Sequence, residues 1–221
     1  MRLPVSNRAW AMESLRVDDN HLTGMLKWLN EKTDDDVISP EYYVFRRVVA
    51  KLQKDGLICK KGVDLTGSLG RPPELKTLTE KGELFALSVR NALFGLYGIR
   101  PDEDRREASP EFMRFVTASE EPPIHVGTCV LEALRIHDQV NAKQISDWIF
   151  QATNGQIDFD ARMVSLALAN LARRDNYCEV VGDKKLERCQ IMHRKTESGL
   201  TLVERSRDVS LRIYDALGLA A

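Results

Sequence analysis

The sequence predicts a mainly α-helical protein with small β-hairpins, an α+β chain built as two copies of one unit. Apolar residues recur at helical spacing along most of the chain. Short strand-like runs, such as 56–62 and 74–79, are separated by stretches rich in glycine and proline. Segments of the first half also return in the same order in the second half. With 221 residues, the chain is long enough for two small domains.

Four collinear matches support an internal duplication. The matched pairs are "ESLRVDD" (13–19) with "EALRIHD" (132–138), "LTGMLKWL" (22–29) with "KQISDWIF" (143–150), 44–62 with 163–181, and "TEKG" (79–82) with "TESG" (196–199). The third pair aligns Cys59 with Cys178, and beyond the fourth pair Arg90 meets Arg207 and Tyr97 meets Tyr214. We therefore expect domains at 1–98 and 124–221, joined by an acidic, proline-containing linker at 99–123.

Each unit is expected to form three helices, two strands and a long final helix. The third helix of the first unit begins at Ser39-Pro40-Glu41, a serine cap followed by proline in the first turn. The glycines and prolines between 67 and 73 rule out a helix there and leave a loop between two strands. The expected helices are 7–17, 21–32, 39–54 and 80–97 in the first unit, and 127–137, 142–153, one from 158 or 160, and one from 199 in the second; the expected strands are 56–62, 74–79, 177–182 and 189–196.

Three helices followed by a β-hairpin are the arrangement of the winged helix, a variant of the helix-turn-helix. The segment "KLQKDGLICKKG…GRPPELKTLTEKG" resembles the end of a MarR/PadR-type winged-helix regulator. The resemblance covers residues 39–84 well and the second copy loosely. It implies tandem winged-helix (wHTH) domains, with helix 3 as the recognition helix and Arg71 at the tip of the hairpin, the wing.

The Gly-Arg-Pro tip suits close approach to a surface. Glycine lets the backbone come near, and proline holds the loop stiff and removes donors for sheet pairing. One arginine presented in this way fits the narrow, electronegative minor groove of DNA. The alternative is that Arg71 is only a solvated hairpin tip.

Helix 3 of the first unit divides into an apolar face and a cationic face. Phe45, Val48, Val49 and Leu52 follow the i, i+3, i+4, i+7 pattern of a core face. The outward face would contact bases and phosphates, since arginine pairs with guanine while lysine and tyrosine reach phosphate oxygens. The predicted DNA-binding residues of this unit are Tyr42, Tyr43, Arg46, Arg47, Lys51 and Lys54 on the helix, and Lys60, Lys61, Arg71 and Lys76 on the hairpin.

The second unit departs from this pattern. The positions of Arg46, Arg47 and Lys51 hold Ser165, Leu166 and Asn170, while Lys54 becomes Arg173. The remaining candidates for DNA contact there are Arg162, Arg173, Lys184 and Lys185. Two readings stay open: this unit contacts DNA weakly through its hairpin, or its helix 3 has turned to a protein partner.

The helix after the first wing is apolar on more than one side, so a single small domain does not cover it, and its counterpart in the second unit is expected to pack against it. The resemblance implies that these helices build a dimer interface. Two assemblies remain open, a pseudo-dimer formed within one chain and a true homodimer. The pseudo-dimer would present its two wings to half-sites about 34 Å apart, one turn of DNA.

Composition and charge narrow the function classes. Net charge is −1, yet residues 40–81 hold nine Lys and Arg against five Asp and Glu. No run is long and apolar enough for a membrane span, and no secretory signal is visible, so we expect a cytoplasmic protein. The four cysteines lack zinc-site spacing and are expected to be mostly buried thiols; we expect no metal, no cofactor and no catalytic constellation.

These observations favour a non-enzymatic, DNA-binding transcriptional regulator with double-stranded DNA as its partner. Two alternatives remain: a protein-interaction scaffold of a larger complex built from tandem winged helices, and a plasmid or phage replication initiator.

Overall fold

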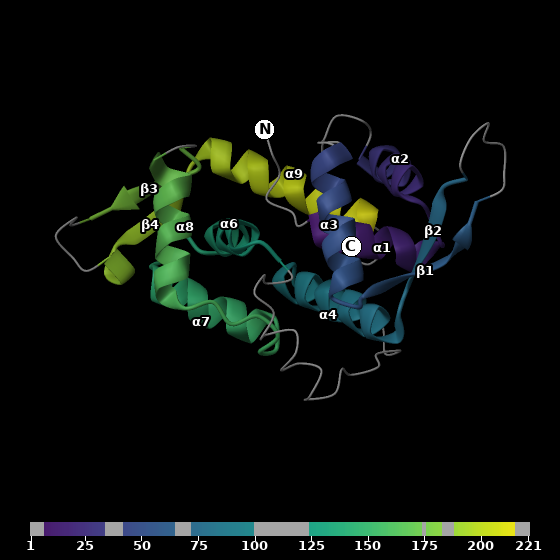
Figure 1. Cartoon of the computed structure of the whole chain (residues 1–221). Helices are drawn as coiled ribbons and strands as arrows, with labels where there is room; N and C mark the ends of the chain where they lie inside the picture. The colour runs from purple at the N-terminus through teal and green to yellow at the C-terminus, as the bar shows by residue number, and fades with distance from the viewer. Residues whose placement is uncertain are drawn as a thin grey trace.

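The computed structural model describes residues 7–33, 42–64, 72–99, 124–173, 176–182 and 188–214. Over these residues the chain is mainly helical with two small antiparallel hairpins, which confirms the expected α+β class (Figure 1). Arg71, Lys184 and Lys185 lie outside the described residues, as does the predicted linker apart from the buried Ile99.

The first half of the chain forms helix α1 (Asn7–Val17), α2 (Leu22–Thr33) and α3 (Tyr42–Lys54), then a hairpin and a long helix. Strand β1 (Ile58–Val63) pairs antiparallel with β2 (Glu74–Leu78), with an irregularity between Lys60 and Gly62. Helix α4 (Glu80–Leu96) follows directly.

The second half repeats this order of elements. It contains α6 (Val126–Ile136), α7 (Ala142–Ala152) and α8 (Ala161–Arg173), the strands β3 (Cys178–Val181) and β4 (Met192–Lys195), and α9 (Glu197–Ile213). The expected strand at 189–196 is shorter, because Arg188–Gln190 form a turn of 3₁₀ helix before it. The expected helices and strands otherwise agree with the structure within about three residues wherever both ends are described.

Each hairpin also pairs with the segment that precedes the second helix of its unit. Asn20 and Lys76 exchange two backbone hydrogen bonds of 3.1 and 2.9 Å, and Val140 and His193 exchange two of 3.0 and 2.9 Å. These bridges attach each hairpin to the segment between the first two helices of its half, in addition to its covalent links to the helices before and after it. Both attachments fix the orientation of the hairpin.

The "TEKG" and "TESG" motifs form the same junction in both halves. Thr79 and Thr196 cap α4 and α9 by accepting hydrogen bonds from the backbone N–H of Gly82 and Gly199. Each glycine lies against a carbonyl oxygen of the preceding segment, that of Leu57 or Tyr177. A Cβ atom at either position would therefore clash with a backbone carbonyl, which explains why both positions hold glycine.

This junction corrects the alignment of Cys59 with Cys178. Because Gly82 faces the Leu57 carbonyl and Gly199 faces the Tyr177 carbonyl, Leu57 corresponds to Tyr177, and Cys178 corresponds to Ile58. The second half has one more residue between its third helix and its strand, and a shift of one residue reverses the faces of a strand. Cys178 is accordingly buried, whereas Cys59 is exposed, so the expectation of buried thiols is wrong at Cys59.

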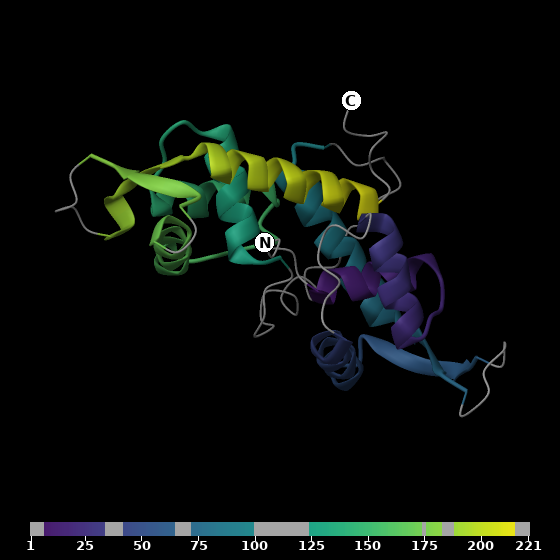
Figure 2. The same cartoon turned by 90° about the horizontal axis from the view of Figure 1, so that it is seen from above.

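The two halves form an elongated molecule with one hairpin at each end (Figure 1, Figure 2). Helices α3 and α8 lie on the same side of the molecule with their axes roughly parallel. The last helix of each half packs on the other half, α4 on α7 and α9 on α2. The buried apolar residues of both halves form one continuous core.

Where the two halves contact each other, equivalent arginines each reach the opposite half. Arg90 donates a 3.1 Å hydrogen bond to the carbonyl oxygen of Tyr214, and Arg207 donates one of 2.9 Å to that of Tyr97. The same two arginines pair with the buried carboxylates of the two halves, Arg90 with Glu13 at 3.7 Å and Arg207 with Glu132 at 3.0 Å. The contact of one half is thus repeated by the other, as in a two-fold interface.

Candidate nucleic-acid interface

Helix α3 buries a narrow apolar stripe and turns the rest of its surface outward. Phe45, Val49 and Leu52 are buried, as the sequence predicts, and Val48 packs half-buried beside them. The i, i+4, i+7 spacing of the three buried residues places them on one face of the helix. The arginines at positions 46 and 47 therefore point away from the core.

The outward face of α3 holds most of the predicted DNA-binding residues. Tyr42, Tyr43, Arg46, Arg47 and Lys54 are exposed, and Lys51 is half-buried. The rings of Tyr42 and Tyr43 pack edge to face, with centroids 5.7 Å apart. Within the described part of the chain, Arg46, Arg47 and Lys54 form no ion pair or hydrogen bond, so their charges are open to a ligand.

The hairpin cations, in contrast, have acidic partners. Lys60 lies 3.1 Å from a Glu74 carboxylate oxygen, and Lys76 lies 2.7 Å from the other one. Lys61 pairs with Asp19, at the end of the turn that follows α1. These ion pairs lower the pKa of both carboxyls: Lys76 and then Lys60 act on Glu74, and Lys61 acts on Asp19.

Lys76 differs from the other two hairpin lysines because its side chain is only 11% exposed. Its ammonium group also donates a 3.1 Å hydrogen bond to the Gln53 side chain of α3. Lys76 thus ties the hairpin to α3 and fixes the angle between them. Lys60 and Lys61 remain exposed on β1, and their pairs are of the weak surface kind that a phosphate can replace.

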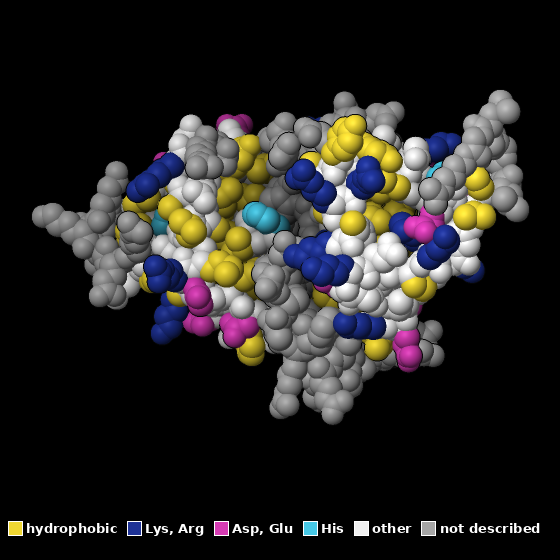
Figure 3. Space-filling view, viewed as in Figure 1, with side chains coloured by type: hydrophobic (Ala, Val, Ile, Leu, Met, Phe, Trp, Pro, Cys, Tyr) yellow, Lys and Arg dark blue, Asp and Glu magenta, His cyan; other side chains and the backbone are white. Residues whose placement is uncertain are grey.

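Together, Arg46, Arg47, Lys54, Lys60 and Lys61 form what we call the cationic face. On the face shown in Figure 3, Lys and Arg side chains gather over α3 and along the β1–β2 hairpin. Because Lys76 joins these two elements, the face is held as one unit rather than as two independent segments.

The corresponding surface of the second half is largely apolar. On α8, Leu166 is 62% exposed and Met163 is 43% exposed. Arg162 and Arg173 are exposed near the two ends of the helix. Figure 3 shows hydrophobic side chains gathered over α8, whereas Lys and Arg side chains gather over α3.

Sequence reasoning missed the acidic partners of the hairpin. Glu74 and Lys76 are two residues apart on one strand, and β1 carries Lys60 opposite Lys76, so strand periodicity places all three side chains on one face. That signal was present in the sequence. The pair between Lys61 and Asp19 joins segments 42 residues apart and depends on the tertiary fold.

The described residues offer no metal site, since no group of three or more His, Cys, Asp or Glu side chains converges within them. Burial raises the pKa of the Cys178 thiol to about 12 and also raises that of Cys129, so both stay protonated. None of the described helices is long and apolar enough to cross a membrane.

No protein-family model matches the chain, and no curated protein matches its sequence significantly.

Proposed function

We propose that this protein binds double-stranded DNA through the cationic face and acts as a transcriptional regulator. In this proposal each half of the chain is a winged helix, α3 enters the major groove, and the β1–β2 hairpin follows the adjacent backbone. The repeated order of elements and the bridge between each hairpin and its helical core support the winged-helix assignment.

One observation carries the proposal. Arg46, Arg47 and Lys54 are exposed on α3 without an acidic partner among the described residues. Lys76 links this helix to the hairpin that carries the exposed Lys60 and Lys61. Surface cations of a protein with nearly neutral net charge are usually balanced by nearby acids. Exposed cations that lack such acids, on a helix that fits the major groove, favour binding to the polyanionic DNA duplex.

The test measures the affinity for a fluorescein-labelled duplex of random sequence, by anisotropy, over a range of salt concentrations. The double variant R46A/R47A is expected to bind more weakly and to lower the salt slope by about 1–2 units, because each lost phosphate contact removes about 0.9. The control K27A/K143A removes two cations from α2 and α7 and should leave the slope unchanged. Equal loss in both variants, or no loss in R46A/R47A, would contradict the proposal.

A further inference from the structure

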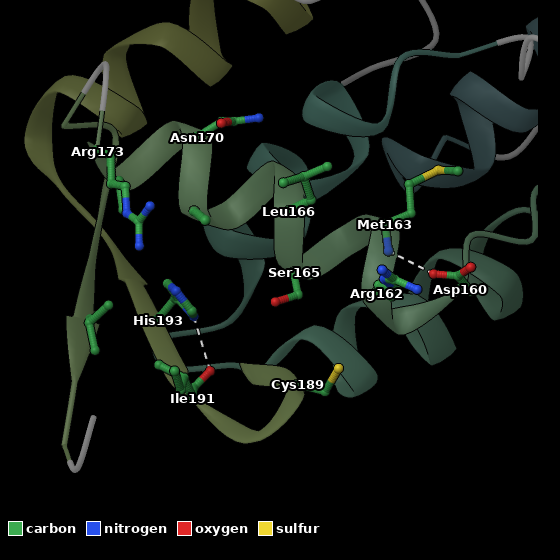
Figure 4. Close-up of a pocket in the computed structure, with 13 residues that line it drawn as sticks. Asp160, Arg162, Met163, Ser165, Leu166, Asn170, Arg173, Cys189, Ile191 and His193 are labelled. Carbon is green, nitrogen blue, oxygen red and sulfur yellow. Dashed lines mark hydrogen bonds between the residues drawn. The ribbon is translucent and has the colours of Figure 1, made fainter. Parts of the chain in front are cut away.

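A groove lies between α8 and the β3–β4 hairpin and has a volume of about 660 Å³ (Figure 4). Its lining is mostly apolar and includes Met163, Leu166, Val180 and Ile191. The guanidinium groups of Arg162 and Arg173 belong to the same lining, at opposite ends of α8. The groove therefore has an apolar middle and two cationic ends.

Neither arginine is neutralised within the part of the chain that the structure describes. Among the described residues that line the groove, Asp160 alone carries a carboxylate, which accepts a 2.7 Å hydrogen bond from the backbone N–H of Met163 and caps the start of α8. Arg162 and Arg173 are 11 residues apart, which corresponds to about 16 Å along a helix. Two anionic groups with this separation would complement the groove.

The rim of the groove distinguishes between possible occupants. Leu166 and Met163 are 62% and 43% exposed, and Figure 4 shows them projecting from α8 beside the hollow. A small molecule in the groove would contact these side chains but cover only part of them, whereas a helix laid along the groove would cover them more fully. DNA is disfavoured here, because the α3 positions of Arg46 and Arg47 correspond to Ser165 and Leu166 on α8.

We propose that the α8 groove binds an amphipathic helix of a partner protein, with apolar side chains toward Leu166 and Met163 and one carboxylate near each of Arg162 and Arg173. The carboxylates of such a helix would be about 11 residues apart if it lay parallel to α8. This site is separate from the cationic face of the first half, so it gives the protein a second partner in addition to DNA.

The test uses display selection of random peptides of roughly 20 residues against the full-length protein. The wild type is expected to enrich peptides with apolar residues at i, i+3 or i+4, and i+7, and with acidic residues about 11 positions apart. Selection against R162E/R173E should enrich basic residues at those positions instead. Affinity for the best wild-type peptide should fall at least about tenfold in L166E.

Controls keep the result specific to the groove. R46A/R47A should lose DNA binding and keep the peptide, whereas L166E should keep both its circular dichroism spectrum and its DNA binding. Enriched peptides without acidic residues, or no enrichment, would overturn the proposal. So would displacement of the peptide by duplex DNA, which would make the groove a DNA site, or a wild-type dimer that L166E dissociates, which would make its occupant a second copy of the chain.

Discussion

Glu74 pairs with Lys60, which belongs to the cationic face, and with Lys76, which joins the hairpin to α3. Its oxygens lie 3.1 Å from Lys60 and 2.7 Å from Lys76, and its negative charge offsets part of the local field. In the proposed binding mode, a phosphate has to compete with these pairs. The carboxylate would therefore limit the affinity for DNA while it helps to hold the hairpin in place.

The variant E74Q should bind duplex DNA more tightly than the wild type, because Lys60 becomes available to a phosphate while the amide still accepts a hydrogen bond from Lys76. The salt slope should become steeper by about one unit, corresponding to one more phosphate contact. Anisotropy titrations at several salt concentrations measure both changes. The control E31Q removes an exposed carboxylate on α2. Unchanged binding by E74Q, or an equal gain in E31Q, would argue against a role of the hairpin in binding.

His125 and His193 make stability depend on pH. Desolvation lowers the pKa of both imidazoles, although only His193 is buried and His125 is exposed. Nδ1 of His125 accepts a 3.1 Å hydrogen bond from the backbone N–H of Gly127 at the start of α6. In the unfolded chain the usual pKa is about 6.5, so the unfolded state binds protons more readily than the folded state. The stabilisation is therefore present above about pH 6.5 and is lost as pH falls below it.

The variant H125N should reduce this pH dependence. Asparagine is a good helix cap that does not titrate, so the free energy of unfolding should stay nearly constant at pH 7 and fall less steeply between pH 7 and 5. H125A lacks the cap and should lose about 1 kcal/mol at pH 7. Urea denaturation at several pH values measures both. An unchanged slope in H125N would show that His125 does not titrate with folding.

At the scale of elements, local patterns predict the structure where one face of an element is buried. The three buried residues of α3 and the starts of α4 and α9 follow from helical spacing and from the Thr-x-x-Gly caps. Local patterns do not predict which side chains pair when they are far apart in the sequence, as the pair of Lys61 and Asp19 illustrates. The alignment of Cys59 with Cys178 failed because the second half has one added residue between α8 and β3. That residue leaves no local signal in the sequence, yet it moves every side chain of the strand to the opposite face.

Gly82 provides a test of the junction between the hairpin and α4. A Cβ atom there would lie 1.9 Å from the carbonyl oxygen of Leu57, so backbone has to move. We expect G82A to lower the free energy of unfolding by about 1–3 kcal/mol, the usual range for overpacking. The control G62A adds a methyl group on β1 where no heavy atom lies within 4 Å and should change stability little. Chemical denaturation compares them, and equal stabilities would contradict the close contact.

At the scale of the whole molecule, the reciprocal arginine contacts join the two halves. Glu132 is fully buried and is held by two arginines of its own half, Arg135 at 2.7 Å and Arg207 at 3.0 Å. Because Arg207 also donates a hydrogen bond to the Tyr97 carbonyl of the first half, the position of its charge depends on the contact between the two halves. A buried carboxylate that loses one of two cations is strongly disfavoured. The chain should therefore unfold as one cooperative body.

Removing Arg207 tests this coupling. R207A should lower the free energy of unfolding by about 2–4 kcal/mol, because it leaves Glu132 undercompensated and the Tyr97 carbonyl without its donor. The double variant R90A/R207A should separate the transition into two. R194A removes an exposed cross-strand pair and should cost at most about 1 kcal/mol. A single transition in R90A/R207A, observed by calorimetry, would show that the apolar core alone couples the halves.

DNA binding by the cationic face is the central claim, and NMR titration of the ¹⁵N-labelled protein with duplex DNA tests it most directly. The account predicts that the side-chain Nε–H signals of Arg46 and Arg47 and the amide signals of α3 and β1 shift first and saturate together, while those of α8 and β3 change little. Shifts confined to α8 and the second hairpin, or no shifts at low salt, would contradict it.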